Sequence, residues 1–144
     1  MVNLTKRRQE ELKKSLGVHI ILEFFGCDPN TLTRREYVER VMLEAAQKAN
    51  THSIGTFFHQ FKPYGVSGVI IIEESHISIH TWPEHGFAAI DFFYCSDEVD
   101  PEKAIEVLIE GFKPTRISRV EFERGSFKEL NAQETKPEQV LSIA

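Results

Sequence analysis

The chain has no run of about 18 consecutive apolar residues, the length that a membrane-spanning helix needs. Its N-terminus is too polar for a secretory signal, so we expect a cytoplasmic protein. It contains only two cysteines, Cys27 and Cys95, and they do not form a CxxC pair. Such spacing argues against a zinc knuckle or a dithiol redox motif. In the reducing cytoplasm we expect both cysteines to be free thiols.

An excess of positive charge is also absent. The sequence has 22 acidic residues against 17 lysines and arginines, a formal net charge of -5, which argues against nucleic acid as the main partner. No linker rich in proline, glycine or serine divides the chain, and it contains no internal repeat. With 41% hydrophobic residues the chain can bury a core, so we expect a single domain over residues 1–144.

Short runs rich in β-branched and aromatic residues, bounded by turn residues, predict strands. They lie at residues 17–26, 52–61, 66–73, 77–82, 87–94 and 116–122. Consecutive strands joined by short turns pair antiparallel. The expected fold class is α+β: an antiparallel sheet with helices packed on one face, a two-layer sandwich. Because the strands are apolar on both parities, the uncovered face could hold a second copy of the chain, sheet to sheet or edge to edge.

Two amphipathic helices are expected. Apolar residues at helical spacing predict the first over residues 30–49, after Asp28-Pro29, which supplies an N-cap and a proline in the first turn. Asp100-Pro101 starts the second helix in the same way. Residues 1–16 are predicted to form a polar helical lead-in, and the residues from Lys128 onward a polar tail.

The most informative segment follows the strand at 66–73. Residues 74–84, Glu-Ser-His-Ile-Ser-Ile-His-Thr-Trp-Pro-Glu, begin by placing a hydroxyl, a carboxylate and two imidazoles within seven residues. A serine with acid and base groups this close can be a nucleophile. Each residue alone has a simpler explanation. Ser75 could be a turn serine, His80 a hydrogen-bonded strand histidine, and Cys95 a buried packing residue.

From Lys62 to Cys95 the sequence KPYGVSGVIIIEESHISIHTWPEHGFAAIDFFYC closely resembles the core of the small bacterial and archaeal S-adenosylmethionine decarboxylases. The resemblance rests on several motifs together: Tyr64-Gly65-Val66-Ser67-Gly68, the Glu-Ser-His triplet, His80-Thr81-Trp82-Pro83-Glu84, and a cysteine twenty residues past the serine. It extends more loosely from Leu16-Gly17 to about Gly125.

The resemblance implies a proenzyme that cuts its own chain to make a pyruvoyl cofactor. Ser75 Oγ would attack the carbonyl carbon of Glu74 and convert the peptide bond into an ester. A base would then remove the Ser75 Cα proton, and the resulting dehydroalanine would hydrolyse to the pyruvoyl group with loss of ammonia. The products would be a beta chain, residues 1–74, and an alpha chain, residues 75–144. The pyruvoyl group would hold the substrate through a Schiff base and serve as the electron sink for decarboxylation.

The resemblance also implies roles for other residues. His80 matches the proton acceptor in processing, since an imidazole is a base available near neutral pH, and Ser67 matches a serine that supports processing. Cys95 matches the donor of a proton to the decarboxylated carbon. Phe61 and His80 match groups that sandwich the adenine ring, and Glu84 matches the carboxylate that binds the ribose hydroxyls.

The implied activity is decarboxylation of S-adenosylmethionine to S-adenosylmethioninamine, the aminopropyl donor for spermidine biosynthesis. The implied assembly is a homodimer of two alpha and two beta chains, and no metal ion is implied. One geometric point stays open. On an unbroken strand Ser75 and His80 have opposite parity, so either the chain bends at the scissile bond or another geometry brings them together.

Three other functions fit parts of the sequence. A pyruvoyl-dependent arginine decarboxylase on the same scaffold would share the processing residues, although Phe61 favours an adenosyl substrate. A zinc hydrolase would use Glu74, His76 and His80, which share one strand parity and offer the three ligands of a catalytic site. A non-enzymatic α+β regulatory module would need none of this chemistry.

Overall fold

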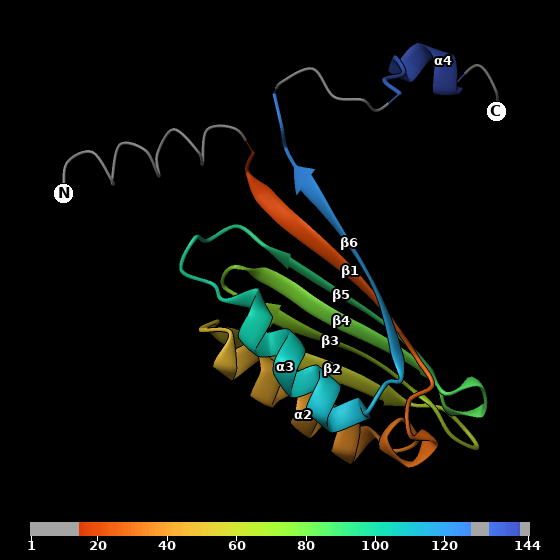
Figure 1. Ribbon diagram of the computed structural model, residues 1–144. Helices are drawn as coiled ribbons and strands as arrows, with labels where there is room; N and C mark the ends of the chain where they lie inside the picture. Colours follow the sequence, from red (N-terminus) through yellow and green to blue (C-terminus); the bar gives the residue numbers. More distant parts are fainter. Residues whose placement is uncertain (1–14, 128–132, 142–144) are drawn as a thin grey trace.

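The computed structural model describes residues 15–127 and 133–141, and within them six strands form one sheet (Figure 1). Across the sheet the order is β2-β3-β4-β5-β1-β6. Every neighbouring pair of strands is antiparallel, as the sequence predicts. The strands are β1 Gly17–Phe25, β2 Ser53–Gln60, β3 Val66–Ile72, β4 Ser75–Trp82, β5 Phe87–Tyr94 and β6 Arg116–Arg124.

Two helices, α2 (Arg35–Lys48) and α3 (Pro101–Phe112), lie side by side on one face of this sheet (Figure 1). The expected two-layer α+β fold is therefore confirmed. Asp100 caps α3 as predicted, since its side chain accepts a hydrogen bond from the Lys103 N–H at 3.4 Å. The expected lead-in lies almost wholly outside the described residues. The expected polar tail contains a short exposed helix, α4 (Pro137–Leu141).

The first long helix begins later than the sequence predicts. Asp28 caps the chain as expected, but the element that follows is a short 3-10 helix, η1 (Pro29–Thr31). The hydroxyl of Thr33 donates to the Pro29 carbonyl at 2.6 Å and so competes for the acceptor of the next helical turn. The α-helix starts only at Arg35, whose N–H donates to the side chain of Gln60 at 2.7 Å.

Alternate residues of the strands point toward the two helices and form the core. Each fully buried aliphatic or aromatic side chain contributes about 1.5–3 kcal/mol. Its members on the strands and helices include Ile20, Leu22, Phe24, Ile70, Ile72, Ile77, Ile79, Ile90, Phe92, Val38, Val41, Met42, Leu108 and Phe112. The helices approach each other closely at Gly111, where a Cβ atom would lie 2.4 Å from Cγ1 of Val41.

The opposite side of the sheet, which we call the open face, carries no helix among the described residues (Figure 1). Its exposed large hydrophobic residues, which share one strand parity, are Ile21, Phe57, Ile71, Trp82, Val120 and Phe122. The edge strand β6 is exposed along nearly its whole length. Such a hydrophobic surface is typical of an interaction site.

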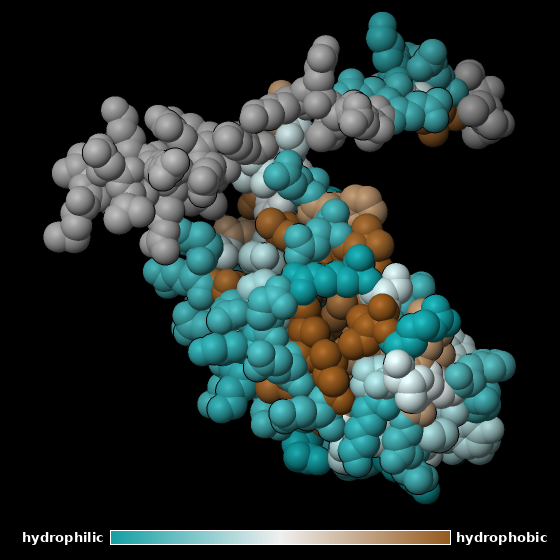
Figure 2. Space-filling model, viewed as in Figure 1, coloured by the Kyte–Doolittle hydropathy of each residue, from teal (hydrophilic) through white to brown (hydrophobic). Residues whose placement is uncertain are grey.

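The helix-bearing side is not fully covered either. Figure 2 shows hydrophobic residues at the surface of this side, between α3 and β6. Helix α2 contacts β2 and β3, toward the other edge of the sheet, and α3 packs against α2. Among the described residues no helix has the length and apolar character that crossing a membrane requires.

Candidate active site

Glu74, in the turn between β3 and β4, and Ser75, the first residue of β4, are each under a constraint. Glu74 is only 7% exposed, and its carboxylate accepts a hydrogen bond from the His52 N–H at 2.8 Å. Ser75 has a φ of 140°, in a region that residues with a side chain rarely adopt. A backbone held in such a region costs about 1–3 kcal/mol. The peptide bond between these two residues is therefore anchored on one side and strained on the other.

Cys95 lies beside this peptide bond. It follows the last residue of β5, and its backbone N–H donates to the carbonyl oxygen of Glu74 at 3.0 Å. A hydrogen bond to that oxygen polarises the carbonyl and favours attack at its carbon. The residue itself is exposed. Glu74, Ser75 and Cys95 thus meet at one end of the sheet.

Ser67 and His80 form a second group, on the open face. They are directly opposite each other on β3 and β4, and Ser67 Oγ lies 2.8 Å from Nδ1 of His80. Cross-strand neighbours on one face of an antiparallel pair are close enough for such a contact. The two residues that the sequence assigns to processing therefore form a hydrogen-bonded pair.

A pocket of about 250 Å³ adjoins this pair. Phe61, Ser67, His80 and Glu84 all line it, together with two aromatic residues, Tyr64 and Trp82. Every residue that the sequence assigns to substrate binding is thus part of one pocket. A second, mainly apolar hollow of about 210 Å³ shares Ser67 and His80 with it and is lined further by Phe57 and His59.

Hydrogen bonds to the turn before β3 hold Phe61 in place. Its N–H donates to the carbonyl of Gly65 at 2.8 Å. The side-chain amide of Gln60 donates to the carbonyl oxygens of Thr33, Phe61 and Gly65, at 2.9, 3.1 and 3.0 Å. Gly65 has a φ of 107°, which explains the need for glycine at this position. The pocket wall is therefore tied to the start of α2.

The two groups are not in contact within one chain. Strand β4 runs unbroken from Ser75 to Trp82, so Ser75 and His80 keep the opposite parity that the sequence implies. Five residues of strand separate them by about 16 Å. The chain does not bend at the scissile bond in a way that would join the two residues.

A third group lies on the open face near Ser75. Ligand-type atoms of His19, His76 and Asp91 are all within 4.8 Å of one another. Nε2 of His76 lies 3.6 Å from one Asp91 carboxylate oxygen, and Nε2 of His19 lies 3.6 Å from the other. A guanidinium nitrogen of Arg124 is 2.9 Å from Nδ1 of His19. Because this places a positive charge next to the cluster, the cluster is poorly suited to a metal cation.

The zinc arrangement that the sequence allowed is not formed by the residues described. The Glu74 carboxylate lies against His52, at 3.3 Å from its Nδ1, whereas His80 contacts Ser67. Only His76 of that trio belongs to the cluster with Asp91. The three side chains therefore do not converge on a common point.

The two thiols lie in different environments, and both are free, as expected. Cys27 is 4% exposed, and burial raises the pKa of its thiol to about 11. Tyr94, the cross-strand partner of Ser75, also has a raised pKa, first because it is buried and second because Glu121 is near. Cys95, by contrast, is open to solvent.

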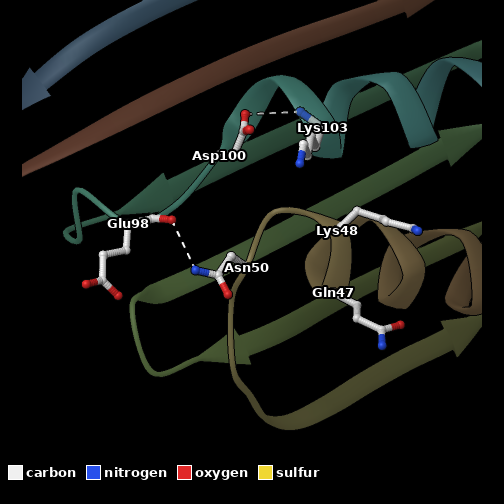
Figure 3. A pocket seen from close by; sticks show the side chains of 6 residues that line it. All are labelled: Gln47, Lys48, Asn50, Glu98, Asp100 and Lys103. Carbon is white, nitrogen blue, oxygen red and sulfur yellow. Dashed lines mark hydrogen bonds between the residues drawn. The ribbon is translucent and has the colours of Figure 1, made fainter.

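A separate hollow lies at the C-terminal end of α2 and the start of α3 (Figure 3). It is polar, and its lining includes Asn50, which donates to the Glu98 carbonyl at 3.3 Å, and the capping residue Asp100. None of the residues assigned to catalysis or substrate binding lines it. These contacts join the two helices, and we assign the hollow no chemistry.

The sequence reading missed several members of these groups. Tyr64 and Trp82 line the pocket, and Trp82 shares the parity of His80 on β4. His19 and Asp91 are polar residues inside the mainly apolar strands β1 and β5. Two signals in the sequence could have identified them. A polar residue within a mainly apolar strand points to His19 and Asp91, and an aromatic residue at the strand parity of His80 points to Trp82.

The two-layer fold, with its groups of serine, imidazole and thiol side chains on one sheet, is that of a small α+β enzyme. The model of the S-adenosylmethionine decarboxylase family matches residues 18–125. This chain belongs to that family, as its motifs predict. A non-enzymatic module is thereby excluded.

Individual relatives agree with this assignment. The S-adenosylmethionine decarboxylase proenzyme of Thermotoga petrophila is 46% identical over 127 residues, which are 88% of this chain and 98% of that protein. The proenzyme of Acidithiobacillus ferrooxidans is 47% identical over 112 residues, 78% of this chain and 84% of that protein. The crystal structure of the adenosylmethionine decarboxylase from Aquifex aeolicus matches with a TM-score of 0.74 and 38% identity, covering 83% of this chain and 99% of that one.

Proposed function

We propose that this protein is made as a proenzyme, cleaves itself between Glu74 and Ser75, and then decarboxylates S-adenosylmethionine. The observation that carries the proposal is the geometry of this peptide bond, with its strained φ at Ser75 and its carbonyl oxygen bonded to the Cys95 N–H. Release of about 1–3 kcal/mol of strain on the way to the ester would accelerate the acyl shift by roughly one to two powers of ten. Several relatives are named proenzymes, which agrees with self-cleavage.

Cleavage would yield a beta chain of residues 1–74 and an alpha chain of residues 75–144 that begins with a pyruvoyl group derived from Ser75. The site suits this group because Ser75 is the first residue of β4 and remains paired with β5. A pyruvoyl group supplies the electron sink that loss of CO2 requires. The exposed thiol of Cys95, held beside the cleavage point by its backbone, is the proposed donor of the proton that replaces CO2.

The pocket on the open face supports an adenosyl substrate. Aromatic side chains suit stacking with adenine, and Phe61 is 46% exposed at the pocket wall, where a ring could lie against it. The carboxylate of Glu84, on the same pocket, can accept hydrogen bonds from the ribose hydroxyls. The product would be S-adenosylmethioninamine, used in the cytoplasm for spermidine synthesis.

Arginine is the second candidate substrate, because a pyruvoyl arginine decarboxylase would share the processing residues. Arginine has no ring for Phe61 to stack against, and it has no ribose for Glu84 to bind. Three aromatic residues around one small pocket favour the adenosyl substrate. The relatives' names point the same way.

We further propose that the active form is a homodimer, with two alpha and two beta chains, whose open faces meet. The separation of Ser75 from His80 by about 16 Å within one chain motivates this arrangement. A second copy could bring its Ser67, His80 and pocket to the Ser75 and Cys95 of the first. The exposed hydrophobic residues of the open face, among them Phe57 at 70% and Phe122 at 50%, supply the apolar area that such contact needs.

Intact mass spectrometry of the purified protein tests self-cleavage. We expect two masses, those of residues 1–74 and of a pyruvoyl-started chain 75–144. Ser75→Ala should give one uncut mass, because the attacking oxygen is gone. A wild-type chain that stays full length after long incubation would contradict the proposal, and so would a Ser75→Ala chain that is cut at the same bond.

Cys95→Ala tests the proton donor separately. We expect the variant to cleave, because a backbone N–H at this position is kept, but to lose decarboxylation of S-adenosylmethionine. The measurements are the mass of the alpha chain and the release of labelled CO2. Normal CO2 release from the cleaved variant would show that the proton comes from another group.

A further inference from the structure

The acyl shift at Glu74–Ser75 requires a base for the hydroxyl proton of Ser75. This inference rests on the proposed self-cleavage, in which His80 takes a different proton, that of Cα, in a later step. Another imidazole lies next to the nucleophile: Nδ1 of His76 is 3.5 Å from Ser75 Oγ. Bases in a resting site commonly sit at such long distances and close in during reaction.

The conformation of Ser75 explains how this contact arises. On a regular strand, adjacent residues point to opposite faces of the sheet. His76 lies on the open face, opposite Ile71 and Phe93, so the hydroxyl of Ser75 would ordinarily be out of its reach. The φ of 140° at Ser75 is the irregularity that accompanies the contact. The unusual backbone conformation of Ser75 therefore accompanies the approach of its hydroxyl to the imidazole of His76.

A carboxylate faces the far side of the imidazole. Nε2 of His76 faces an Asp91 oxygen at 3.6 Å, and the same oxygen accepts a hydrogen bond from Ser78 at 2.5 Å. If Nε2 carries the hydrogen, Nδ1 is free to accept the serine proton. The order serine, imidazole, carboxylate is the arrangement by which a carboxylate fixes the tautomer of a histidine base.

The remaining charged neighbours support the same tautomers. Arg124 can only donate, so Nδ1 of His19 accepts its hydrogen bond at 2.9 Å and Nε2–H of His19 must point elsewhere. That buried Nε2 makes no hydrogen bond, and it faces the second Asp91 oxygen at 3.6 Å. Asp91 thus lies between two imidazoles, each with its Nε2 3.6 Å from one of the carboxylate oxygens. The groups facing His76 from β1, β5 and β6 are His19, Asp91 and, behind them, Arg124.

We propose that His76 is the catalytic base of self-cleavage and that Asp91 is its positioning residue. The proton of Ser75 Oγ moves to Nδ1 of His76 while Oγ forms a bond to the carbonyl carbon of Glu74. The resulting oxyanion is stabilised by the Cys95 N–H. When the C–N bond breaks, His76 returns the same proton to the Ser75 nitrogen, which leaves an ester and a free amine. No oxidant, metal or further reactant is consumed.

The test follows cleavage of freshly purified protein over time on denaturing gels. His76→Ala should cleave about 10²-fold more slowly than wild type, the usual contribution of a general base. Added imidazole should restore part of the rate, because it can fill the vacated space. The uncut chain should resist hydroxylamine, since the block precedes the ester. His80→Ala, which blocks a later step, should instead accumulate a full-length chain that hydroxylamine cuts.

Asp91→Asn should slow cleavage less than His76→Ala, and combining the two should add no further loss, because both act through one imidazole. The matched control is His85→Ala, an exposed histidine outside the cluster, which should cleave normally. Cleavage of folded His76→Ala at the wild-type rate, its sensitivity to hydroxylamine, or its indifference to imidazole would each overturn the proposal. Failure of self-cleavage itself would instead show in the wild-type chain, which would remain whole.

Discussion

Polar side chains that lie among large apolar ones carry the proposed chemistry. The rings of His19 and Phe93 are 5.3 Å apart, and those of His76 and Phe93 are 5.8 Å apart, so Phe93 packs against both imidazoles next to Asp91. Apolar neighbours exclude water and strengthen the remaining polar contacts. Because each of these polar side chains has few alternative partners, substituting one of them should affect one step of the proposed self-cleavage.

The two thiols should differ sharply in reactivity toward iodoacetamide. The pKa of Cys27 is raised to about 11 by burial, so at pH 8 only about one molecule in a thousand carries its thiolate. We expect native protein to take up label at Cys95 alone, and label at Cys27 to appear as the pH approaches 11 or the chain unfolds. Mass spectrometry reads this directly, because the proposed cleavage puts the cysteines on different chains. Rapid labelling of the beta chain at pH 8 would contradict the burial argument.

Phe61→Ala should impair substrate use while sparing self-cleavage. Stacking with adenine is worth about 0.5–1.5 kcal/mol beyond area burial, so kcat/KM for S-adenosylmethionine should fall several-fold. Any activity toward arginine should change little. Phe127→Ala, which removes an 83% exposed ring outside the pocket, is the control. An equal loss on both substrates, or slower cleavage, would mean that Phe61 serves the fold and not adenine.

At the scale of helices and strands, local sequence patterns predicted the positions of nearly all the elements. All six strands appear within a few residues of their expected places, because each is a short β-branched or aromatic run that ends at a turn residue. The predicted start of α2 was wrong, because the observed start depends on hydrogen bonds from Thr33 and to Gln60, and the contact with Gln60 forms only in the tertiary structure. For the same reason the sequence could group Phe61, His80 and Glu84 by resemblance but could not bring Asp91 to His76. That pairing requires knowing that β4 and β5 are neighbours.

Helix packing gives a prediction that runs against helix propensity. Alanine is the better helix former, by about 1 kcal/mol, yet Gly111→Ala should destabilise the fold because its Cβ would lie 2.4 Å from Val41. Overpacking costs about 1–3 kcal/mol, so after the gain in helix propensity the free energy of unfolding should fall by up to about 2 kcal/mol. Urea unfolding of the uncut Ser75→Ala background measures this, with Glu106→Ala on the exposed side of α3 as control. A higher urea midpoint for Gly111→Ala would show that the helices separate easily.

In the molecule as a whole, the pocket and the imidazole groups lie on the face of the sheet that carries no helix among the described residues. One face carries α2 and α3 (Figure 1). The other bears the pocket, the imidazoles of His19, His76 and His80, and exposed hydrophobic residues. Stacking two such faces would bury the apolar area and give a four-layer molecule, helices outside and sheets inside. A two-fold axis would then place the Ser67–His80 pair of each copy toward the cleavage point of the other.

Mixed dimers provide the decisive measurement. Ser75→Ala lacks the nucleophile but keeps the Ser67–His80 pair, whereas His80→Ala keeps the nucleophile and lacks the group that takes the Cα proton after the acyl shift. Neither should cleave alone. If one site draws on both copies, a dimer with one chain of each kind contains one complete site, and its His80→Ala chain should be cut.

Random pairing should allow cleavage of about half of the His80→Ala chains when the two variants are co-expressed in equal amounts. Differently tagged chains, resolved on a denaturing gel, give the fraction, and light scattering confirms the dimer. The matched control pairs His80→Ala with Ser67→Ala. Both changes damage the same hydrogen-bonded pair, so no mixed dimer has an intact one, and cleavage of the His80→Ala chain should recover far less than in the first mixture. Absence of cutting in the first mixture, with dimers present, would mean that Ser75 and His80 of one chain must meet by a rearrangement of β4.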